Sequence, residues 1–388
     1  MSDFPKPSPR VAVACGGTGG HLFPGLAVAE QLIQRGCQVT LLISPKDVDQ
    51  QAVRAVRGMR VETLPAVGLK RGGELAFVRG FCQSYRKSRK LFESQPPQAA
   101  LAMGGFTSAP PILAAKAFGA QTFLHESNTI PGRANRWLSW VVNRACVGFP
   151  SAARRLHNRA VTVTGTPVRP EFRWRHPGDC RAELGLDPAR PLLLVMGGSQ
   201  GATGINEIAI NTLPMLAQSV PGLQCVHITG PKDFDRVKAA YARLGLDVQT
   251  HAFFGRMELA LGAATAAISR AGASSLAELA AMQLPSLLVP FPEATDNHQF
   301  HNAFAFVETG AARVVEQKDA TPQVVTNLLL ELITTSPARL SMQGALSRWH
   351  TPGAAQQISN DVLTAIEARA RRSALRIPPA AAEPRTIA

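Results

Sequence analysis

The sequence predicts an α/β protein with two Rossmann-like, doubly wound parallel-sheet domains that face each other across a cleft. First, its 388 residues exceed what one hydrophobic core usually supports. Second, short apolar runs alternate with longer segments of helical periodicity, which is the order of βαβ units. Third, two apolar runs lead directly into glycine-rich turns, at 16–21 and 197–202. Because ligands bind beyond the carboxyl ends of parallel strands, we expect both turns at the cleft.

The expected elements repeat the same rhythm in both halves of the chain. We assign an N-terminal domain to 10–166, a C-terminal domain to 167–350 and a C-terminal helix to 351–373, and we expect a disordered tail over 374–388. Three prolines and the absence of a regular period indicate a linker at 167–184. The expected strands are 11–14, 38–43, 61–64, 99–103, 121–125, 144–149, 160–165, 191–196, 224–230, 248–253, 266–269, 285–290 and 312–315.

Composition narrows the class of protein. Apolar residues make up 45% of the chain and charged residues 18%, as in a protein that buries a sizeable core. Six cysteines lie far apart without a CxxC pair, which argues against a disulfide framework or a zinc site. The net charge of +14 favours an anionic partner, but no nucleic-acid-binding motif is present. With no signal peptide visible and no run near the ~18 apolar residues of a membrane span, we expect a cytosolic protein.

A basic amphipathic helix is expected over 69–92. Its cationic residues are interleaved with apolar ones, namely Arg71, Arg79, Arg86, Lys87, Arg89 and Lys90 with Leu75, Phe77, Val78, Phe81, Tyr85 and Leu91. Such a helix either packs by its apolar side alone or lies on an anionic membrane surface.

The second glycine-rich turn, GGSQGA, admits two interpretations. Gly197, Ser199 and Gly201 fit the G-x-S-x-G elbow of α/β-hydrolases, in the strand-turn-helix context that the elbow requires. Asp296 and either His298 or His301 follow in the chain order of a catalytic triad, although only a few residues apart. The favoured interpretation is a diphosphate cradle, in which backbone amides and the serine hydroxyl approach an anion at a helix N-terminus.

A second anion site is expected at the small-residue turn 270–275, which precedes another helix. The alternative interpretation is a well-capped helix, with Ser274 as the N-cap and Glu278 as a first-turn acid. A carboxylate beside a diphosphate is unfavourable unless it accepts hydrogen bonds from sugar hydroxyls. Glu278 is therefore a candidate ribose ligand.

Polar residues crowd the segment 290–306. Asp296, His298 and His301 could be metal ligands, but their spacing matches no zinc signature, and a loop that binds hydroxyl groups is the better interpretation. The DVD at 47–49 could match a metal clamp of sugar transferases, but a three-residue match is weak and a helix cap explains it more simply. We therefore predict no metal site.

In the first half, polar groups follow two expected strands. MGGFTSAP at 103–110 is another strand-glycine-helix junction. HESN places His125, Glu126 and Asn128 just past a strand end, where an active site draws its polar groups, although a histidine-glutamate contact can also be structural.

Taken together, GGTGGHLFPGLAVAEQL, MGGFTSAP, LHESN, GTPVR, GGSQGA, SRAGASSLAEL and TDNHQFHNA resemble the MurG family of peptidoglycan glycosyltransferases. The resemblance runs from about 11 to about 366 with the motifs in the expected order. Two motifs depart from the family, HESN where HEQN is commoner and GTPVR where GNPVR is commoner. The second departure places Thr166 at the hinge.

The resemblance implies a GT-B enzyme without metal or cofactor, which inverts the anomeric carbon while it transfers N-acetylglucosamine from UDP-N-acetylglucosamine to the muramyl 4-hydroxyl of lipid I, giving lipid II. It implies a donor site in the C-terminal domain, with the backbone of Phe254 at the uracil and Glu278 on the ribose. The other implied binding residues are Ser199 and Ala273, Ser274, Ser275, Leu276 and Ala277 at the diphosphate, His298 and Gln299 at hydroxyl or phosphate groups, Asn128 at the transferred sugar, Arg169 near the nucleotide, and Thr18, Gly19 and Gly20 from the N-terminal domain.

Single displacement needs one base and stabilisation of the departing UDP. His21 stands at a helix start, where the positive end of the dipole favours its neutral form, and we favour it as the base. Glu126 is the rival base or the group that orients His21. The first glycine loop is then free for the pyrophosphate of the lipid acceptor.

The expected partners are UDP-N-acetylglucosamine, lipid I and an anionic membrane surface. The helix over 69–92 gains a role in this reading, because lipid I lies in a membrane rich in anionic headgroups. We expect a peripheral protein on the cytoplasmic face of the bacterial inner membrane, and no nucleic-acid partner. Another lipid glycosyltransferase or a UDP-sugar epimerase of the same fold is the nearest alternative, and a serine hydrolase at Ser199 is a more distant one.

Overall fold

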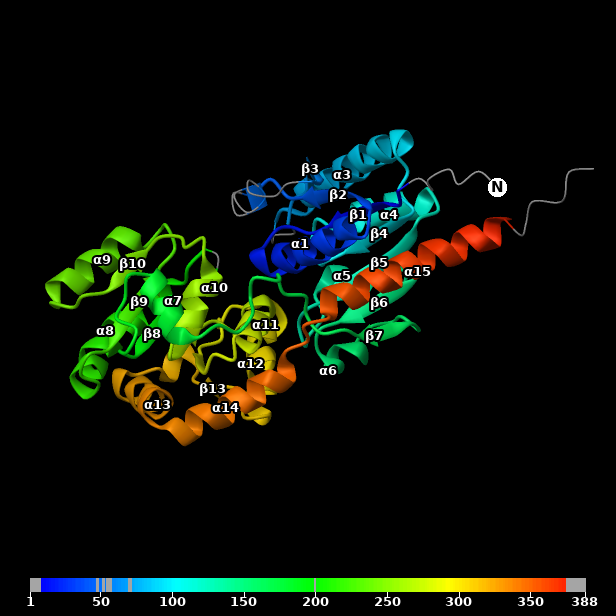
Figure 1. Cartoon of the computed structure of the whole chain (residues 1–388). Helices are drawn as coiled ribbons and strands as arrows, with labels where there is room; N and C mark the ends of the chain where they lie inside the picture. The colour runs from blue at the N-terminus through cyan, green and yellow to red at the C-terminus, as the bar shows by residue number, and fades with distance from the viewer. Residues whose placement is uncertain are drawn as a thin grey trace, which may run out of the picture.

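The computed structural model describes residues 8–46, 49–50, 53, 58–68, 72–198 and 200–374. Ser199, residues 47–48 of the DVD motif, residues 69–71 of the expected basic helix and the tail from 375 onward lie outside the described residues. The chain forms two α/β lobes (Figure 1). Two segments pass between them, the linker near 167–176 and the short connection at 350–353 between the last two helices.

The N-terminal lobe is built on a seven-stranded parallel sheet of order β3-β2-β1-β4-β5-β6-β7. Successive residues of β1 enter opposite cores, Val11 and Val13 on one face and Ala12 and Ala14 on the other. Helices therefore cover both faces, as parallel sheets require. The strands are β1 (Arg10–Ala14), β2 (Gln38–Ile43), β3 (Arg60–Thr63), β4 (Ala99–Ala102), β5 (Gln121–Glu126), β6 (Arg144–Val147) and β7 (Val161–Val163).

Two layers of helices enclose this sheet. One face is covered by α1 (Gly19–Gln34), whose residues Leu22, Leu26 and Leu32 are buried against it. The other face carries α3 (Glu74–Ser94), α4 (Ala109–Ala117), α5 (Arg133–Leu138) and α6 (Pro150–Ala153). The expected basic helix is confirmed as α3, over most of its predicted range.

The C-terminal lobe repeats the plan with a six-stranded parallel sheet of order β10-β9-β8-β11-β12-β13. Its strands are β8 (Leu192–Met196), β9 (Gln224–Ile228), β10 (Gln249–His251), β11 (Ala266–Ser269), β12 (Ser286–Leu288) and β13 (Arg313–Val314). Its helices are α7 (Pro177–Glu183), α8 (Thr203–Ser219), α9 (Phe234–Arg243), α10 (Met257–Ala263), α11 (Ala273–Ala281), α12 (His298–Glu308), α13 (Pro322–Thr334) and α14 (Ser336–Trp349), with the short turns η1 (Thr295–Asn297) and η2 (Gln317–Asp319).

The last helix returns to the first lobe. After α14 the chain crosses back, and α15 (Ala354–Ala374) lies along the N-terminal sheet (Figure 1). Ile358, Val362 and Ile366 of α15 are buried in the same core as α1. The expected C-terminal helix is thus present, and it completes the N-terminal lobe instead of standing apart from both domains.

Each of the thirteen expected strands is confirmed, with ends shifted by a few residues. The expectation of an irregular linker through 184 was wrong in its second half, because 177–183 form α7. The side chain of Cys180 lies fully buried in the C-terminal core, so this helix belongs to the lobe. A single proline at its N1 position starts the helix where the sequence pattern indicated irregular chain.

Candidate active site

The loops that follow the strands of both sheets meet at the interface between the lobes. In the N-terminal lobe these are the loops after β1, β4 and β5, and in the C-terminal lobe those after β8, β11 and β12. An ion pair joins the loops after β5 and β12 directly, from Arg136 to Asp296 at 2.7 Å. The carboxyl ends of the strands are where the sequence predicts a shared site.

His21 is the third residue of α1, and its imidazole lies over the second glycine loop of the N-terminal lobe. A Cβ atom added to Gly104 would come within 2.9 Å of the Nδ1 and Cε1 atoms of His21. One added to Gly105 would come within 3.1 Å of its Cδ2 atom. Both glycines also have positive φ angles, +102° and +76°, which other residues rarely adopt. The two glycines of the MGGF motif thus leave the space that the imidazole of His21 occupies.

Burial lowers the pKa of His21 below its ordinary value of 6.5. The Glu126 carboxylate opposes this shift, whereas His298 on the other lobe adds to it by like-charge repulsion. The imidazole is therefore neutral at pH 7, as expected. The main physical cause is desolvation, where the sequence had suggested the helix dipole.

Glu126 ends β5 and is almost fully buried, with 1% of its surface exposed. Its Oε1 accepts hydrogen bonds from the backbone amide (2.8 Å) and Nδ2 (3.0 Å) of Asn128. Its Oε2 accepts from the amide of Gly132 and from Nδ2 of Asn135, both at 3.0 Å. Four donors thus converge on one carboxylate, which ties the loop 127–135 to the end of the strand.

Asn128 is held from both sides. While its Nδ2 donates to Glu126, its Oδ1 accepts from Nδ2 of Asn302 at 3.0 Å. Asn302 is fully buried in α12 and also accepts from the amide and hydroxyl of Thr129, at 2.9 and 3.0 Å. Its Nδ2 donates a further hydrogen bond to the carbonyl of Ala271. Asn302, which the sequence shows only as one member of a polar cluster, is thus one of the side chains that join the lobes.

The first glycine loop presents free amides at the start of α1. The amide of Gly17 donates to Asp49 at 2.7 Å, so this group points away from the cleft. The amides of Thr18, Gly19 and Gly20 have no hydrogen-bond acceptor within the part of the chain that the structure describes. Unsatisfied amides at a helix N-terminus form an anion site.

On the donor side, α11 begins earlier than the sequence indicated. Gly272 is the N-cap and Ala273 the first helical residue, so Ser274 is not the cap and Glu278 stands in the second turn. The side chains of Ala273 and Leu276 are buried in the C-terminal core. These two residues can therefore contact a ligand in the cleft only through their backbone, as small-residue turns at a helix N-terminus do.

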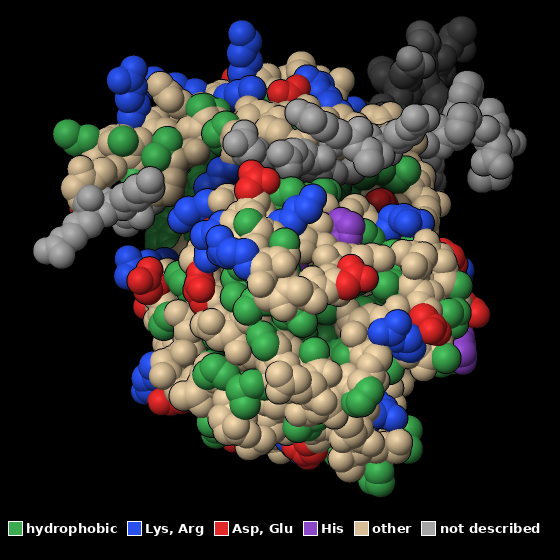
Figure 2. All heavy atoms as spheres, turned by 90° about the vertical axis from the view of Figure 1, so that its left-hand side faces the viewer, with side chains coloured by type: hydrophobic (Ala, Val, Ile, Leu, Met, Phe, Trp, Pro, Cys, Tyr) green, Lys and Arg blue, Asp and Glu red, His purple; other side chains and the backbone are tan. Residues whose placement is uncertain are grey.

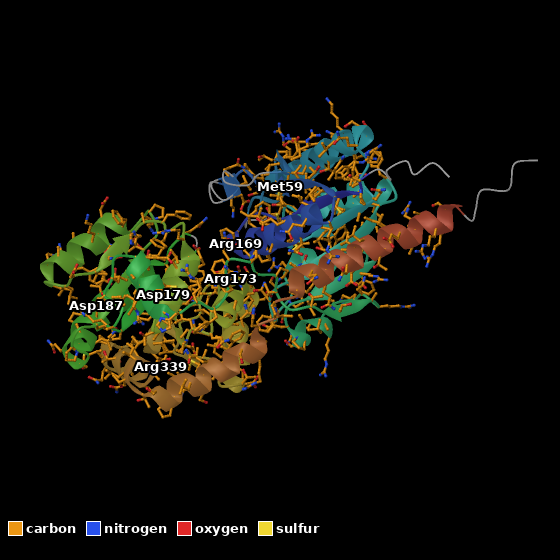
Figure 3. All side chains as sticks on the ribbon, in the orientation of Figure 1. Met59, Arg169, Arg173, Asp179, Asp187 and Arg339 are labelled. Atoms are coloured by element: carbon orange, nitrogen blue, oxygen red, sulfur yellow. The ribbon has the colours of Figure 1, made fainter. Side chains whose placement is uncertain are left out.

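Glu278 and Arg169 lie close enough to interact electrostatically. Burial raises the pKa of Glu278 to about 7. The positive charge of Arg169 opposes this shift, and the negative charge of Glu171 adds to it. The Arg169 guanidinium stacks between the rings of Phe23 and Phe172, at 4.9 and 5.0 Å from their centroids. Figure 3 shows Arg169 in the linker between the lobes. It therefore contacts elements of both.

The remaining expected donor residues lie on two loops. His298 and Gln299 begin α12, where His298 Nδ1 lies 2.8 Å from the carbonyl of Thr295 and Gln299 accepts from the amide of Phe291. Phe254 follows β10 and packs against the C-terminal core, with its ring 4.8 Å from that of His251. Ser199 lies outside the described residues.

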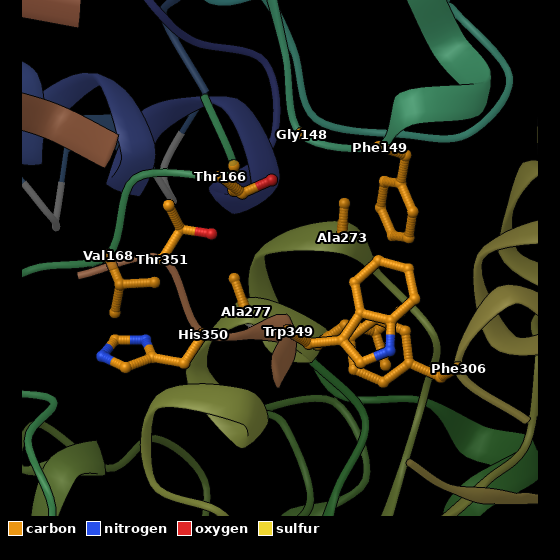
Figure 4. Close-up of a pocket in the computed structure, with 12 residues that line it drawn as sticks. Gly148, Phe149, Thr166, Val168, Ala273, Ala277, Phe306, Trp349, His350 and Thr351 are labelled. Carbon is orange, nitrogen blue, oxygen red and sulfur yellow. The ribbon is translucent and has the colours of Figure 1, made fainter. Parts of the chain in front are cut away.

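A small pocket, partly open to solvent, lies where the two lobes meet (Figure 4). The ring of Phe149 of the N-terminal lobe is tilted against those of Trp349 and Phe306 of the other lobe, with centroids 5.3 and 6.2 Å away. Thr166 lines the same pocket, and a Cβ atom on Gly148 would come within 2.3 Å of its hydroxyl oxygen. Thr166, at which the sequence departs from the commoner family motif, thus lies where the two lobes meet.

Among the residues described, no group of three or more His, Cys, Asp and Glu side chains is arranged to hold a metal ion. Asp296, one of the candidates weighed from the sequence, instead forms the ion pair with Arg136. The helices of the described segments include none that is long and apolar enough to cross a membrane.

Fold and site together define a glycosyltransferase with two Rossmann-like lobes. Residues 11–147 match the glycosyltransferase family 28 N-terminal domain, and residues 192–358 match the glycosyltransferase family 28 C-terminal domain. A structure described as Acinetobacter baumannii MurG is similar with a TM-score of 0.71 and 27% identity, over 92% of this chain and 99% of that one.

Curated relatives narrow the family. A protein of Anaeromyxobacter sp. (strain K) is 34% identical over 93% of this chain and 94% of its own length, and one of Geobacter metallireducens is 33% identical over 92% and 98%. Both are named UDP-N-acetylglucosamine--N-acetylmuramyl-(pentapeptide) pyrophosphoryl-undecaprenol N-acetylglucosamine transferase. The chain belongs to this family of N-acetylglucosamine transferases, the MurG family.

The fold alone is shared more widely. A putative UDP-N-acetylglucosamine 2-epimerase from Listeria monocytogenes superposes with a TM-score of 0.68 at 14% identity, covering 94% of this chain and 97% of that one. At this identity the likeness establishes the architecture only. The epimerase and hydrolase alternatives are set aside because the relatives that match nearly the whole chain are named as transferases.

Proposed function

We propose that this chain transfers N-acetylglucosamine from UDP-N-acetylglucosamine to the 4-hydroxyl of the muramyl unit of lipid I, and so forms lipid II. The observation that carries the proposal is the match of nearly the whole chain to transferases named for these substrates. The two lobes supply two anion-binding helix N-termini, which suits a reaction in which donor and acceptor each carry a diphosphate.

The C-terminal lobe holds the donor. The free amides at the start of α11 bind the diphosphate, together with Ser199 in the loop after β8, and Glu278 accepts hydrogen bonds from the ribose. Phe254 borders the uracil, while His298 and Gln299 hold hydroxyl or phosphate groups. Arg169 adds positive charge beside the nucleotide. Backbone amides and fixed cations thus stabilise the UDP that departs.

His21 is the catalytic base. Its neutral imidazole takes the proton of the muramyl 4-hydroxyl, whose oxygen attacks the anomeric carbon of the donor sugar. The bond from that carbon to the β-phosphate oxygen breaks, and UDP leaves from the opposite side with inversion. The lowered pKa supports this role, because a base must be unprotonated before it accepts the proton.

Glu126 is a positioning residue. Its two oxygens already accept four hydrogen bonds, so neither is free to take a proton from the acceptor without breaking the loop that they hold. Through this loop Glu126 places Asn128 at the cleft and adds negative charge near His21, which stabilises the imidazolium that forms during the reaction.

The experiment that tests the function is release of UDP from UDP-N-acetylglucosamine upon addition of a water-soluble lipid I analogue. We expect release that depends on the acceptor and a disaccharide product detected by mass spectrometry. Release without acceptor, or no release with it, would contradict the proposal. His21→Ala, checked for native folding by circular dichroism, serves as the inactive control.

We further propose that α3 rests on the anionic surface of the bacterial inner membrane at its cytoplasmic face. Leu75 and Val78 are 89% and 55% exposed on this helix. Its cationic side chains form part of the Lys and Arg cluster along the upper edge of Figure 2, at the height where Figure 1 shows α3. Exposed apolar residues among cations are typical of helices that lie in a lipid interface.

Sedimentation with vesicles that contain anionic phospholipid tests this surface. Leu75→Ser combined with Val78→Ser should reduce the bound fraction, whereas Leu340→Ser, an exposed leucine of the other lobe at 64%, should not. Phe81 is an unsuitable probe, since its ring is partly buried against the N-terminal core. Equal binding of the double variant and the unmodified protein would argue that α3 serves packing alone.

A further inference from the structure

Lys46 lies beside the first glycine loop and is fixed at both ends. Its backbone carbonyl accepts from the amides of Asp49 and Gln50, which closes a turn after β2. Its side-chain Nζ donates to the carbonyl oxygen of Gly17 at 2.7 Å. The ammonium group is therefore held against the loop, instead of moving freely in solvent.

The ring of Phe106 forms the other wall of this position. Lys46 Nζ stands 5.3 Å from the centroid of that ring, in a cation-π contact. A Cβ atom on Gly17 would lie 2.8 Å from the ring, and one on Gly68 would lie 3.4 Å from it. Phe106 thus connects the first glycine loop, Lys46 and the chain that leads towards α3.

The charges around the loop call for a cation here. Asp49 is fully buried and its Oδ2 accepts from the amide of Gly17 and from both the amide and the hydroxyl of Ser44. This carboxylate orients the loop, but its negative charge disfavours an anion at the neighbouring amides of 18–20. The positive charge of Lys46, held at the Gly17 carbonyl, offsets that repulsion by its attraction for an anion.

We propose that Lys46 binds the pyrophosphate of the lipid-linked acceptor, together with the free amides of Thr18, Gly19 and Gly20. The inference rests on the proposed function, and it adds a side chain that the sequence motifs did not single out. Lys46 is assigned to the acceptor and not to the donor, because the donor's diphosphate meets α11 on the opposite lobe. On this view the ammonium moves from the Gly17 carbonyl to phosphate oxygens when the acceptor binds.

Steady-state kinetics with three substitutions test the assignment. Lys46→Ala and Lys46→Gln should each raise KM for a lipid I analogue by about tenfold or more, the worth of one charged hydrogen bond, while KM for UDP-N-acetylglucosamine stays the same. Lys46→Arg should restore most of the affinity, since it keeps the charge. Lys318→Gln, at an exposed cation of the other lobe, is the matched control.

Lys46→Gln separates the charge from a merely structural role. Glutamine can still donate to the Gly17 carbonyl, so a variant with normal acceptor KM would show that Lys46 only holds the loop and would overturn the proposal. An unchanged acceptor KM in Lys46→Ala would do the same. Melting temperatures close to that of the unmodified protein are expected for all three variants, because the lysine side chain is exposed.

A binding measurement makes failure of this inference distinguishable from failure of the proposed function. Inorganic pyrophosphate is titrated by calorimetry into protein saturated with UDP, which occupies the donor diphosphate site. We expect binding that Lys46→Gln weakens and Lys46→Arg retains. Equal pyrophosphate binding in Lys46→Gln and unmodified protein would contradict the Lys46 site even if transfer proceeds. If Lys46→Gln loses pyrophosphate binding but the unmodified protein shows no transferase activity, the result would instead contradict the proposed function.

Discussion

Asn302 Nδ2 donates to Asn128 Oδ1 at 3.0 Å, and this contact joins the C-terminal lobe to the N-terminal lobe. The same asparagine continues to Ala271, next to the N-terminus of α11, while Asn128 continues to Glu126. A chain of hydrogen bonds thus runs from the proposed diphosphate site to the loop beside His21. We expect this chain to couple the relative position of the lobes to the geometry of His21, the proposed base.

Replacing Asn302 with aspartate should uncouple the lobes. The substitution keeps the shape but removes both donors of Nδ2 and buries a charge, so we expect the free energy of unfolding to fall by about 2–4 kcal/mol. Turnover should fall more than donor affinity, because the donor contacts lie on one lobe. Chemical denaturation and transfer assays measure the two effects, and Asn327→Asp on the exposed side of α13 is a control. A stable, fully active Asn302→Asp variant would refute the coupling.

The pH dependence of kcat, measured with both substrates saturating, should reflect His21. Because burial holds the pKa of His21 below 6.5 and the base must be neutral, kcat should stay constant as the pH falls to 6.5 and decline only below it. His21→Ala should lower kcat by about 100-fold or more and abolish that acidic limb. A limb that persists in the variant would assign the base to another group.

Glu126→Gln tests a positioning role against a basic one. The amide would direct its Nε2 donors at groups that themselves donate, which breaks hydrogen bonds to Asn128 or to Gly132 and Asn135. We expect a loss of stability of about 1–3 kcal/mol and a lower kcat, with the acidic limb of His21 still present. Retention of native stability together with loss of that limb would identify Glu126 as the base. Melting curves and pH profiles on the same preparation decide between them.

Donor affinity should depend on pH through Glu278. Its pKa of about 7 means that the carboxyl group is half protonated near neutrality, and the ionised form accepts stronger, charge-assisted hydrogen bonds from the ribose hydroxyls. KM for UDP-N-acetylglucosamine should therefore rise as the pH falls below 7. Glu278→Gln should raise this KM at all pH values and remove its pH dependence. A KM that changes equally with pH in both proteins would contradict the ribose contact.

Gly105→Ala should displace the imidazole of His21. The residue has a φ of +76°, and its added Cβ atom would approach the Gly16 carbonyl to 2.8 Å and the imidazole to 3.1 Å. Backbone strain alone costs about 1–3 kcal/mol, and displacement of the ring should reduce kcat. Gly58→Ala has a similar φ of +80° but open space around it, so it reports the backbone effect alone. Similar kcat values for the two variants would show that Gly105 does not position His21.

Local pattern was sufficient to predict the strands. The alternation of apolar runs, glycine turns and helical segments specifies parallel βαβ units, because buried strands and amphipathic helices have distinct periods. His21 and Glu126 were candidates because one stands at the start of a helix after a glycine loop and the other at the end of a strand. The start of α11 was misplaced, since Gly272 and Ser274 are both good N-caps and only the backbone of the folded chain selects one.

The sequence by itself therefore determined the two Rossmann-like lobes, the glycine loops and the family, since each depends on residues adjacent in the chain. Only the tertiary structure decided that α15 completes the first lobe, that Glu126 accepts four hydrogen bonds, that Asn302 contacts Asn128, and that Lys46 contacts the first glycine loop. These facts depend on contacts between residues far apart in the chain. No local period records such contacts, because they arise when burial brings separate strand ends to one cleft.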